Sequence, residues 1–227
     1  MKIKTRDLAI MGMLAALAFL TVLFIRIPVV VFLKYEPKDV IITISGFIFG
    51  PLAVLLISTI VSLIEWFTIS ETGHFGFIMN VISTCSFACT AALIYKYKRT
   101  MLGAVIGLVT GLVIMCGVML LWNYLIVPLY MPFVTAAGKA SQPDAYREAV
   151  LPMLTTIFLP FNLLKGGLNG AITLLLYKPI KTALNKTKLL PETEAAKSAK
   201  INFGLILVSV FVIITCVMFI LSWRGII

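Results

Sequence analysis

The chain has 227 residues, of which 61% are hydrophobic and only 12% are charged, and its formal net charge at pH 7 is +10. Soluble domains typically carry about 25% charged residues, so this composition excludes an ordinary soluble protein and indicates an integral membrane protein. The basic residues fall in short clusters between long apolar runs and do not follow one continuous face, which argues against a nucleic-acid-binding protein.

The first apolar run, residues 8–25, follows a basic N-terminus. It is too long for the apolar part of a signal peptide and has no small-residue cleavage site, so we predict a retained transmembrane helix. Gly12 and Ala16, with Ala15 beside them, give this helix a small-residue face. Such a face lets a second helix approach closely, either from this chain or from a partner.

Residues 26–39 combine β-branched residues, two prolines and several charges, which predicts an ordered loop that can include a short extended piece. Asp39 ends this loop and is predicted to cap a short helix over residues 40–49. A run of that length crosses a bilayer only where protein surrounds it or the bilayer thins. After a Gly-Pro break, a third helix is predicted over residues 52–64, with Glu65 at the membrane interface.

The only histidine, His74, lies in a predicted loop before a fourth helix over residues 77–95. A single histidine without a second ligand gives no reason to expect a metal site or a catalytic base. The four cysteines lie in apolar runs and are interpreted as packing residues. Inside the fourth helix, Asn80 carries an amide that needs a hydrogen-bonding partner in lipid.

A fifth helix is predicted over residues 101–124, with Gly103, Gly107 and Gly111 spaced four residues apart. This spacing is typical of a helix face that packs closely against another helix. Near the end of the same helix, Asn123 places another amide between two aromatic residues.

A sixth helix, predicted over residues 151–178, carries Asn162, Lys165 and Asn169. Spacings of three and four residues place these side chains on one helix face. An ionisable residue near the middle of a membrane segment is costly and is typical of a functional site. We interpret Asn162 and Lys165 as ligand contacts, and Asn169, one turn further along, as a helix-packing residue.

The sequence divides into a membrane domain over residues 1–185, a polar cytoplasmic linker over 186–202, and an additional C-terminal transmembrane helix within 203–227. With seven crossings and a cytoplasmic N-terminus, the inner loops hold more Lys and Arg than the outer loops. That bias supports this orientation.

Three amides and a lysine, distributed over three predicted helices, could line one cavity: Asn80, Asn123, Asn162 and Lys165. An amide both donates and accepts hydrogen bonds, whereas lysine only donates, so these groups suit a neutral or modestly negative ligand. The sequence lacks the motifs of serine hydrolases, zinc proteases and P-loop ATPases, which favours a protein that is not an enzyme and has no cofactor or metal. The alternative is that the polar groups bond to one another and hold the bundle together.

Four segments resemble the riboflavin-specific S components of energy-coupling factor (ECF) vitamin transporters: LKYEPKD (33–39), GFIFGP (46–51), GFIMN (76–80) and PFNLLKG (160–166). The resemblance covers about residues 5–185. It implies an all-α integral membrane protein in which a six-helix S-component bundle binds riboflavin near the outer face of the bacterial cell membrane, with the first loop as a lid. The final helix is an addition to that core, and we interpret it as a peripheral anchor, with a partner-binding or regulatory helix as the alternative.

The resemblance also implies residue roles and partners. By motif match, Asn123, Asn162 and Lys165 would hold the flavin, with Gly76, Asn80 and the backbone of Leu33, Lys34 and Tyr35 as neighbours. The face of Gly12, Ala15 and Ala16 would contact a transmembrane T component, which works with two ABC-type ATPases that hydrolyse ATP. Two rivals remain: a transport component for another small heterocyclic vitamin or nucleobase-like compound, and a membrane scaffold without a transport role.

Overall fold

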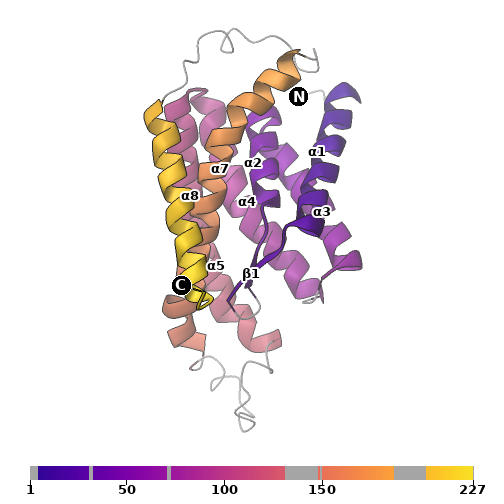
Figure 1. The fold of residues 1–227 in the computed structure, drawn as a ribbon. Helices are drawn as coiled ribbons and strands as arrows, with labels where there is room; N and C mark the ends of the chain where they lie inside the picture. Colours follow the sequence, from indigo (N-terminus) through magenta and orange to yellow (C-terminus); the bar gives the residue numbers. More distant parts are fainter. Residues whose placement is uncertain are drawn as a thin grey trace.

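The computed structural model describes residues 5–30, 33–70, 73–130, 148, 150–186 and 203–226 (Figure 1). Its elements are α1 (Thr5–Phe24), β1 (Ile27–Val30), β2 (Leu33–Tyr35), α2 (Lys38–Phe49), α3 (Pro51–Thr68), α4 (Gly73–Tyr97), α5 (Met101–Tyr130), the π-helical turn η1 (Leu154–Phe158), α7 (Leu159–Lys186) and α8 (Phe203–Trp223). Each of the seven helices predicted from the sequence is present. Among the described residues, six helical segments are long and apolar enough to span a membrane, and α2 is not one of them.

The helices form one bundle, with α1 and α8 at opposite edges (Figure 1). At the first edge, α1 packs against α2 and α3, and at the other edge α8 packs against α7 and reaches β1. Between these edges, α4 contacts α2, α3 and α5.

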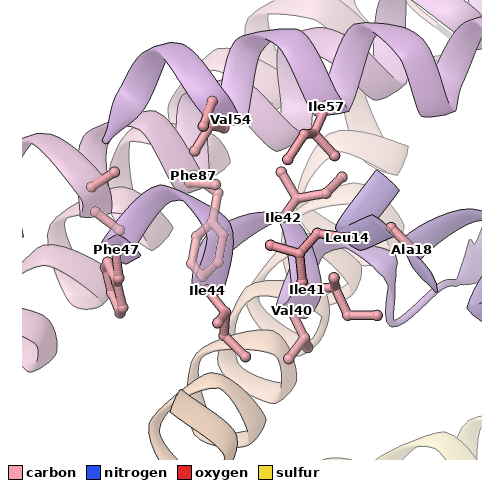
Figure 2. Packing of buried hydrophobic residues seen from close by; sticks show 14 of the residues in the cluster. Leu14, Ala18, Val40, Ile41, Ile42, Ile44, Phe47, Val54, Ile57 and Phe87 are labelled. Carbon is pink, nitrogen blue, oxygen red and sulfur yellow. The ribbon is translucent and has the colours of Figure 1, made fainter. Parts of the chain in front are cut away.

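Helix α2 is short, and the protein surrounds it. All of residues 38–47 are buried, and Figure 2 shows its apolar side chains among residues of α1, α3 and α4: Leu14, Ala18, Val54, Ile57 and Phe87. A helix of this length can lie within the bilayer because its neighbours, and not lipid, cover its sides. Of the two alternatives for this short segment, the structure supports enclosure by protein.

The predicted extended piece in the first loop is an antiparallel hairpin of β1 and β2, in which Ile27 pairs with Tyr35. Its inward-facing residues Val29, Leu33 and Tyr35 are buried in a hydrophobic cluster with Phe158, Phe161 and Ile220. The hairpin is therefore fixed to η1, α7 and α8 by apolar packing.

The glycine spacing in α5 produces a close helix contact. A Cβ atom added at Gly107 would lie 2.8 Å from the carbonyl oxygen of Ala91, and one at Gly111 would lie 2.4 Å from that of Phe87. Both neighbours belong to α4, so the predicted close-packing face is confirmed at these two positions. Gly103 instead lies against Lys98 in the preceding connection.

Only part of the small-residue face of α1 is exposed. Gly12 and Ala16 are exposed, and a Cβ atom at Gly12 would meet nothing within 4 Å. Ala15 is buried with Leu14 and Ala18 in the core. Its assignment to the partner face is therefore wrong, because adjacent residues on a helix point about 100° apart.

Two local predictions are also wrong. Asp39 does not cap α2, because Pro37 is the N-cap residue and no side-chain cap bond forms; Asp39 is instead buried. Helix α4 begins at Gly73, which places His74 in its first turn and not in a loop. Glu65, predicted at the membrane interface, is 2% exposed because it lies in a buried cluster of charges with Lys38.

Candidate functional site

A cavity opens between the hairpin and helices α4, α5 and α7. Its lining residues are Arg26, Leu33, Lys34, Glu36, Met79, Asn80, Ser83, Met119, Asn123, Phe158, Phe161, Asn162 and Lys165. The predicted residues Asn80, Asn123, Asn162, Lys165, Leu33 and Lys34 all belong to this set. Tyr35 and Gly76 do not line the cavity, although both are buried.

Asn162 is oriented by its own helix. Its Nδ2 donates a 2.8 Å hydrogen bond to the carbonyl oxygen of Phe158, one turn earlier. An amide has a second N–H and a carbonyl oxygen, and within the described chain neither of these groups forms a further bond. Asn123 is also buried and has no side-chain hydrogen bond among the described residues. The two amides therefore keep donors and acceptors for a ligand.

A π-helical turn lies directly before this face. In η1 the N–H of Leu159 donates to the carbonyl of Leu154, five residues back. Such widened turns are frequent at functional sites. Here the next residue, Pro160, lacks an N–H and cannot continue the regular helical bonding. Phe158 and Phe161, on either side of the proline, both line the cavity.

Lys165 is held by two partners at the wall of the cavity. Its Nζ lies 3.1 Å from Oδ2 of Asp39 and donates a 3.3 Å hydrogen bond to Oγ of Ser83. Asp39 is 1% exposed, and its other oxygen accepts a 2.6 Å bond from Thr84. A buried ammonium needs such a carboxylate, because charge separated from water is otherwise very costly.

A second buried cluster of charges lies beside the first. Lys38 pairs with Glu36 at 2.8 Å and with Glu65 at 2.5 Å. Arg26 pairs with Glu36 at 2.7 Å, and Asn80 donates a 3.0 Å bond to Glu65. Arg26, Glu36 and Asn80 also line the cavity, so this cluster joins the hairpin and the three helices α2, α3 and α4 at its wall.

The charge of Glu36 is stabilised by its neighbours. Burial by itself would raise the pKa of Glu36, but the attraction and hydrogen bonds of Lys38 and Arg26 outweigh burial and lower the pKa from 4.5 to about 2. Glu36 therefore stays ionised at neutral pH, and the cavity is lined by paired charges and amides. Such a cavity suits a small polar ligand without net charge.

Asn169 lies outside the lining of the cavity. It accepts a 2.9 Å bond from the hydroxyl of Tyr35 and donates a 3.3 Å bond to Asp39, in agreement with its interpretation as a packing residue. The sequence analysis missed Arg26, Glu36 and Ser83 as lining residues. The alternating charges of residues 34–39 were the available signal, since a loop beside a buried lysine is a source of carboxylate partners.

The fold and the cavity define a membrane-embedded helical protein with a site for a small polar molecule. The model of the family "ECF transporter, substrate-specific component" matches residues 6–177. The chain therefore belongs to this family. The match ends before α8, which adds to the part of the chain that the family shares.

The chain is similar to curated proteins of three bacteria. It is 27% identical to the riboflavin transporter RibU of Staphylococcus aureus, over 81% of this chain and 94% of the relative. It is also 27% identical to the riboflavin transporter FmnP of Bacillus subtilis, over 88% of this chain and all of the relative, and 28% identical to RibU of Streptococcus thermophilus, over 80% and 86%. A solved structure of the S component of a bacterial ECF transporter superposes with a TM-score of 0.62 at 25% identity, covering 78% of this chain and 96% of that one.

Proposed function

We propose that this chain is the riboflavin-binding S component of an ECF transporter in the bacterial cell membrane. It takes up the vitamin together with a T component and two ABC-type ATPases, which supply the energy. The observation that carries this proposal is the convergence of Asn123, Asn162 and Lys165 on one buried cavity. The names of the three curated relatives support riboflavin as the ligand.

The free polar groups match the pyrimidine edge of a flavin. That edge presents a carbonyl, an N–H and a second carbonyl in a row, which an amide can pair through one donor and one acceptor. Asn162 lines the cavity and keeps its second N–H and its carbonyl oxygen beyond the bond to Phe158. An ammonium has three donors, and Asp39 and Ser83 engage two of those of Lys165, so a third remains for a flavin carbonyl.

The apolar part of the lining suits the flat ring system. Phe158 and Phe161 come from one wall, and Met79 and Met119 come from α4 and α5. Aromatic and thioether side chains pack well against a planar ring. In this arrangement the ribityl hydroxyls bond to the polar groups beside the hairpin, including Asn80, Glu36 and the backbone of Leu33 and Lys34.

Riboflavin fluorescence tests the assignment directly. Titration of purified protein in detergent should quench flavin emission, and Asn162→Ala and Lys165→Ala should each raise Kd at least about tenfold, which equals about 1.4 kcal/mol. Lys96→Ala, at an exposed lysine, is the matched control and should bind like the wild type. Unchanged emission with folded protein would refute riboflavin as the ligand. Binding that survives both cavity substitutions would refute the site.

The proposal includes an orientation, with the N-terminus in the cytoplasm and the hairpin end of the cavity toward the outside. In this arrangement the exposed Gly12 and Ala16 contact the T component. Helix α8, at the opposite edge of the bundle, leaves that face of α1 free (Figure 1).

Co-purification tests the partner face separately from ligand binding. Gly12→Leu with Ala16→Leu should abolish co-purification with the T component and the ATPases and leave flavin quenching unchanged. Gly117→Leu is the matched control, because Gly117 is also exposed on a membrane helix and a Cβ there meets nothing within 4 Å. Assembly that persists in the double variant would exclude this face of α1 as the contact.

A further inference from the structure

Four side chains form a continuous buried path from the hairpin to the cavity. The hydroxyl of Tyr35 in β2 donates to Oδ1 of Asn169 at 2.9 Å. The amide nitrogen of Asn169 donates to Oδ2 of Asp39 at 3.3 Å, and the same oxygen lies 3.1 Å from Nζ of Lys165. The residues Tyr35, Asn169 and Asp39 are at most 3% exposed, and of the four only Lys165 lines the cavity.

Each bond in this path has a fixed direction. Burial, followed by the charge of Asp39, raises the pKa of Tyr35, so its hydroxyl keeps its proton and acts as the donor. Because Tyr35 occupies the carbonyl oxygen of Asn169, the amide nitrogen of Asn169 faces Asp39. Thr84 engages the other oxygen of Asp39, which leaves Oδ2 to be shared by Asn169 and Lys165. The position of each group is therefore set by the next one.

The path connects three segments of the chain that also pack against one another. Tyr35 belongs to the hairpin, Asp39 to α2, and Asn169 and Lys165 to α7, one turn apart. A ligand carbonyl that takes the third N–H of Lys165 restricts the rotation of that ammonium and so fixes its bond to Asp39. Because Lys165 and Asn169 share Oδ2 of Asp39, this restraint extends to Asn169 and then to Tyr35, since the buried groups have no water to bond to instead.

We propose that Asp39 positions Lys165 for the ligand and that Asn169 and Tyr35 couple this pair to the hairpin. This inference rests on the proposed function for the identity of the ligand. Tyr35, Asn169 and Asp39 are positioning residues, and of the four residues in the path only Lys165 touches the bound molecule. Binding at Lys165 and the local stability of residues 33–36 of the hairpin are then linked.

Amide hydrogen exchange of the ligand-free protein tests the coupling without any flavin. Tyr35→Phe and Lys165→Met should each raise exchange in residues 33–36 at least about fivefold, the effect of losing one buried hydrogen bond. The matched control is Tyr95→Phe, which removes a buried hydroxyl bonded to Tyr177 at 2.6 Å in another part of the bundle. Tyr95→Phe should leave the exchange of residues 33–36 unchanged, and residues 101–112 serve as the internal reference.

A double-mutant cycle on riboflavin affinity provides the second measurement. Tyr35→Phe should raise Kd about fivefold in the wild type, but by less than about twofold when Lys165 is already Met, because the effect of Tyr35 reaches the ligand through Lys165. Asp39→Asn should behave like Lys165→Met in this cycle. Lys165→Met leaves Asp39 unpaired. If this variant does not fold, the double variant Lys165→Met with Asp39→Asn, which removes both charges, takes its place in the cycle.

The two measurements separate this inference from the proposed function. If the wild-type protein did not quench riboflavin emission, the proposed function would be refuted. Hydrogen exchange would still test whether Lys165 and the hairpin are coupled. Unchanged exchange of residues 33–36 in both Tyr35→Phe and Lys165→Met would overturn the coupling. Independent, multiplying effects of Tyr35 and Lys165 on Kd would overturn it as well.

Discussion

Lys38 of α2 and Glu65 of α3 form a buried ion pair in which the ammonium lies 2.5 Å from both carboxylate oxygens. Their side chains are 1% and 2% exposed. Glu36 shares the same ammonium at 2.8 Å, so one lysine connects the end of the hairpin to two helices. Since a buried charge is stable only with its partner, the three residues form one structural unit.

Lys38→Met should destabilise the protein by about 3–5 kcal/mol, because it leaves buried carboxylates without their ammonium. Adding Glu65→Gln to that variant should recover part of the loss, since the uncompensated charge is then gone. Thermal unfolding in detergent measures both effects. Lys98→Met, at an exposed position, should leave the unfolding temperature within about a degree of the wild type.

Glu36 gives the fold a specific acid sensitivity. Its pKa is about 2 in the folded protein and 4.5 when unperturbed, so its contribution to stability is complete above pH 4.5 and is lost as the pH falls toward 2. Between pH 7 and pH 3 the wild type should lose about 2 kcal/mol more stability than Glu36→Gln, in which this contribution is absent. Unfolding temperatures at pH 7, 5 and 3 measure the difference.

The control for this comparison is Glu148→Gln, since Glu148 is exposed. Its pH dependence should follow that of the wild type. A Glu36→Gln variant that loses stability with acid as steeply as the wild type would show that Glu36 does not carry this sensitivity.

The contact between α4 and α5 predicts opposite outcomes for the same substitution at two glycines. Gly111→Ala should destabilise the protein by about 2 kcal/mol, because the added Cβ would lie 2.4 Å from a backbone oxygen of Phe87 and the helices must separate. Gly117→Ala should be neutral or stabilising, since nothing lies within 4 Å and alanine favours a helix. Equal unfolding temperatures for the two variants would contradict the close contact.

Removal of α8 should loosen the hairpin without unfolding the bundle. Ile220 is buried against the hairpin cluster, and Cys216 and Trp223 pack at its edge. A chain that ends after Lys186 should therefore still quench riboflavin, with a Kd raised about threefold to tenfold by loss of this packing. Fluorescence titration of the shortened and complete chains tests this expectation. Complete loss of folding would show instead that α8 belongs to the core.

The sequence predicted those features that depend on local patterns. Apolar run length predicted all seven helices, and the four-residue glycine spacing predicted a close-packing face on α5, although not that α4 is its partner. Amides and a lysine in apolar segments identified Asn80, Asn123, Asn162 and Lys165 as residues that share a cavity. The helices and the glycine face are signals within one segment, where spacing determines which side chains share a face. The shared cavity was inferred from polar residues in three apolar segments, α4, α5 and α7.

The missed features depend on partners that are distant in sequence. Asp39 stands where a helix cap is common, and only the packing of α7 against α2 shows that it binds Lys165. Glu65 lies near the end of α3, and its burial depends on the ion pair with Lys38 of α2. The hydrogen bond between Tyr35 and Asn169 likewise joins two segments whose proximity no local pattern indicates.

The two clusters of charges have an electrical consequence for transport. Their cations are Arg26, Lys38 and Lys165, and their anions are Glu36, Asp39 and Glu65. The six charges cancel, and riboflavin itself is uncharged. If transport moves both charge clusters across the bilayer, their net charge of zero crosses the membrane potential without an energy cost. One uncompensated charge would instead cost about 2.3 kcal/mol per 100 mV. Vesicles that contain the assembled transporter should take up riboflavin at the same rate under potassium diffusion potentials of either sign, whereas Glu36→Gln should make uptake depend on voltage.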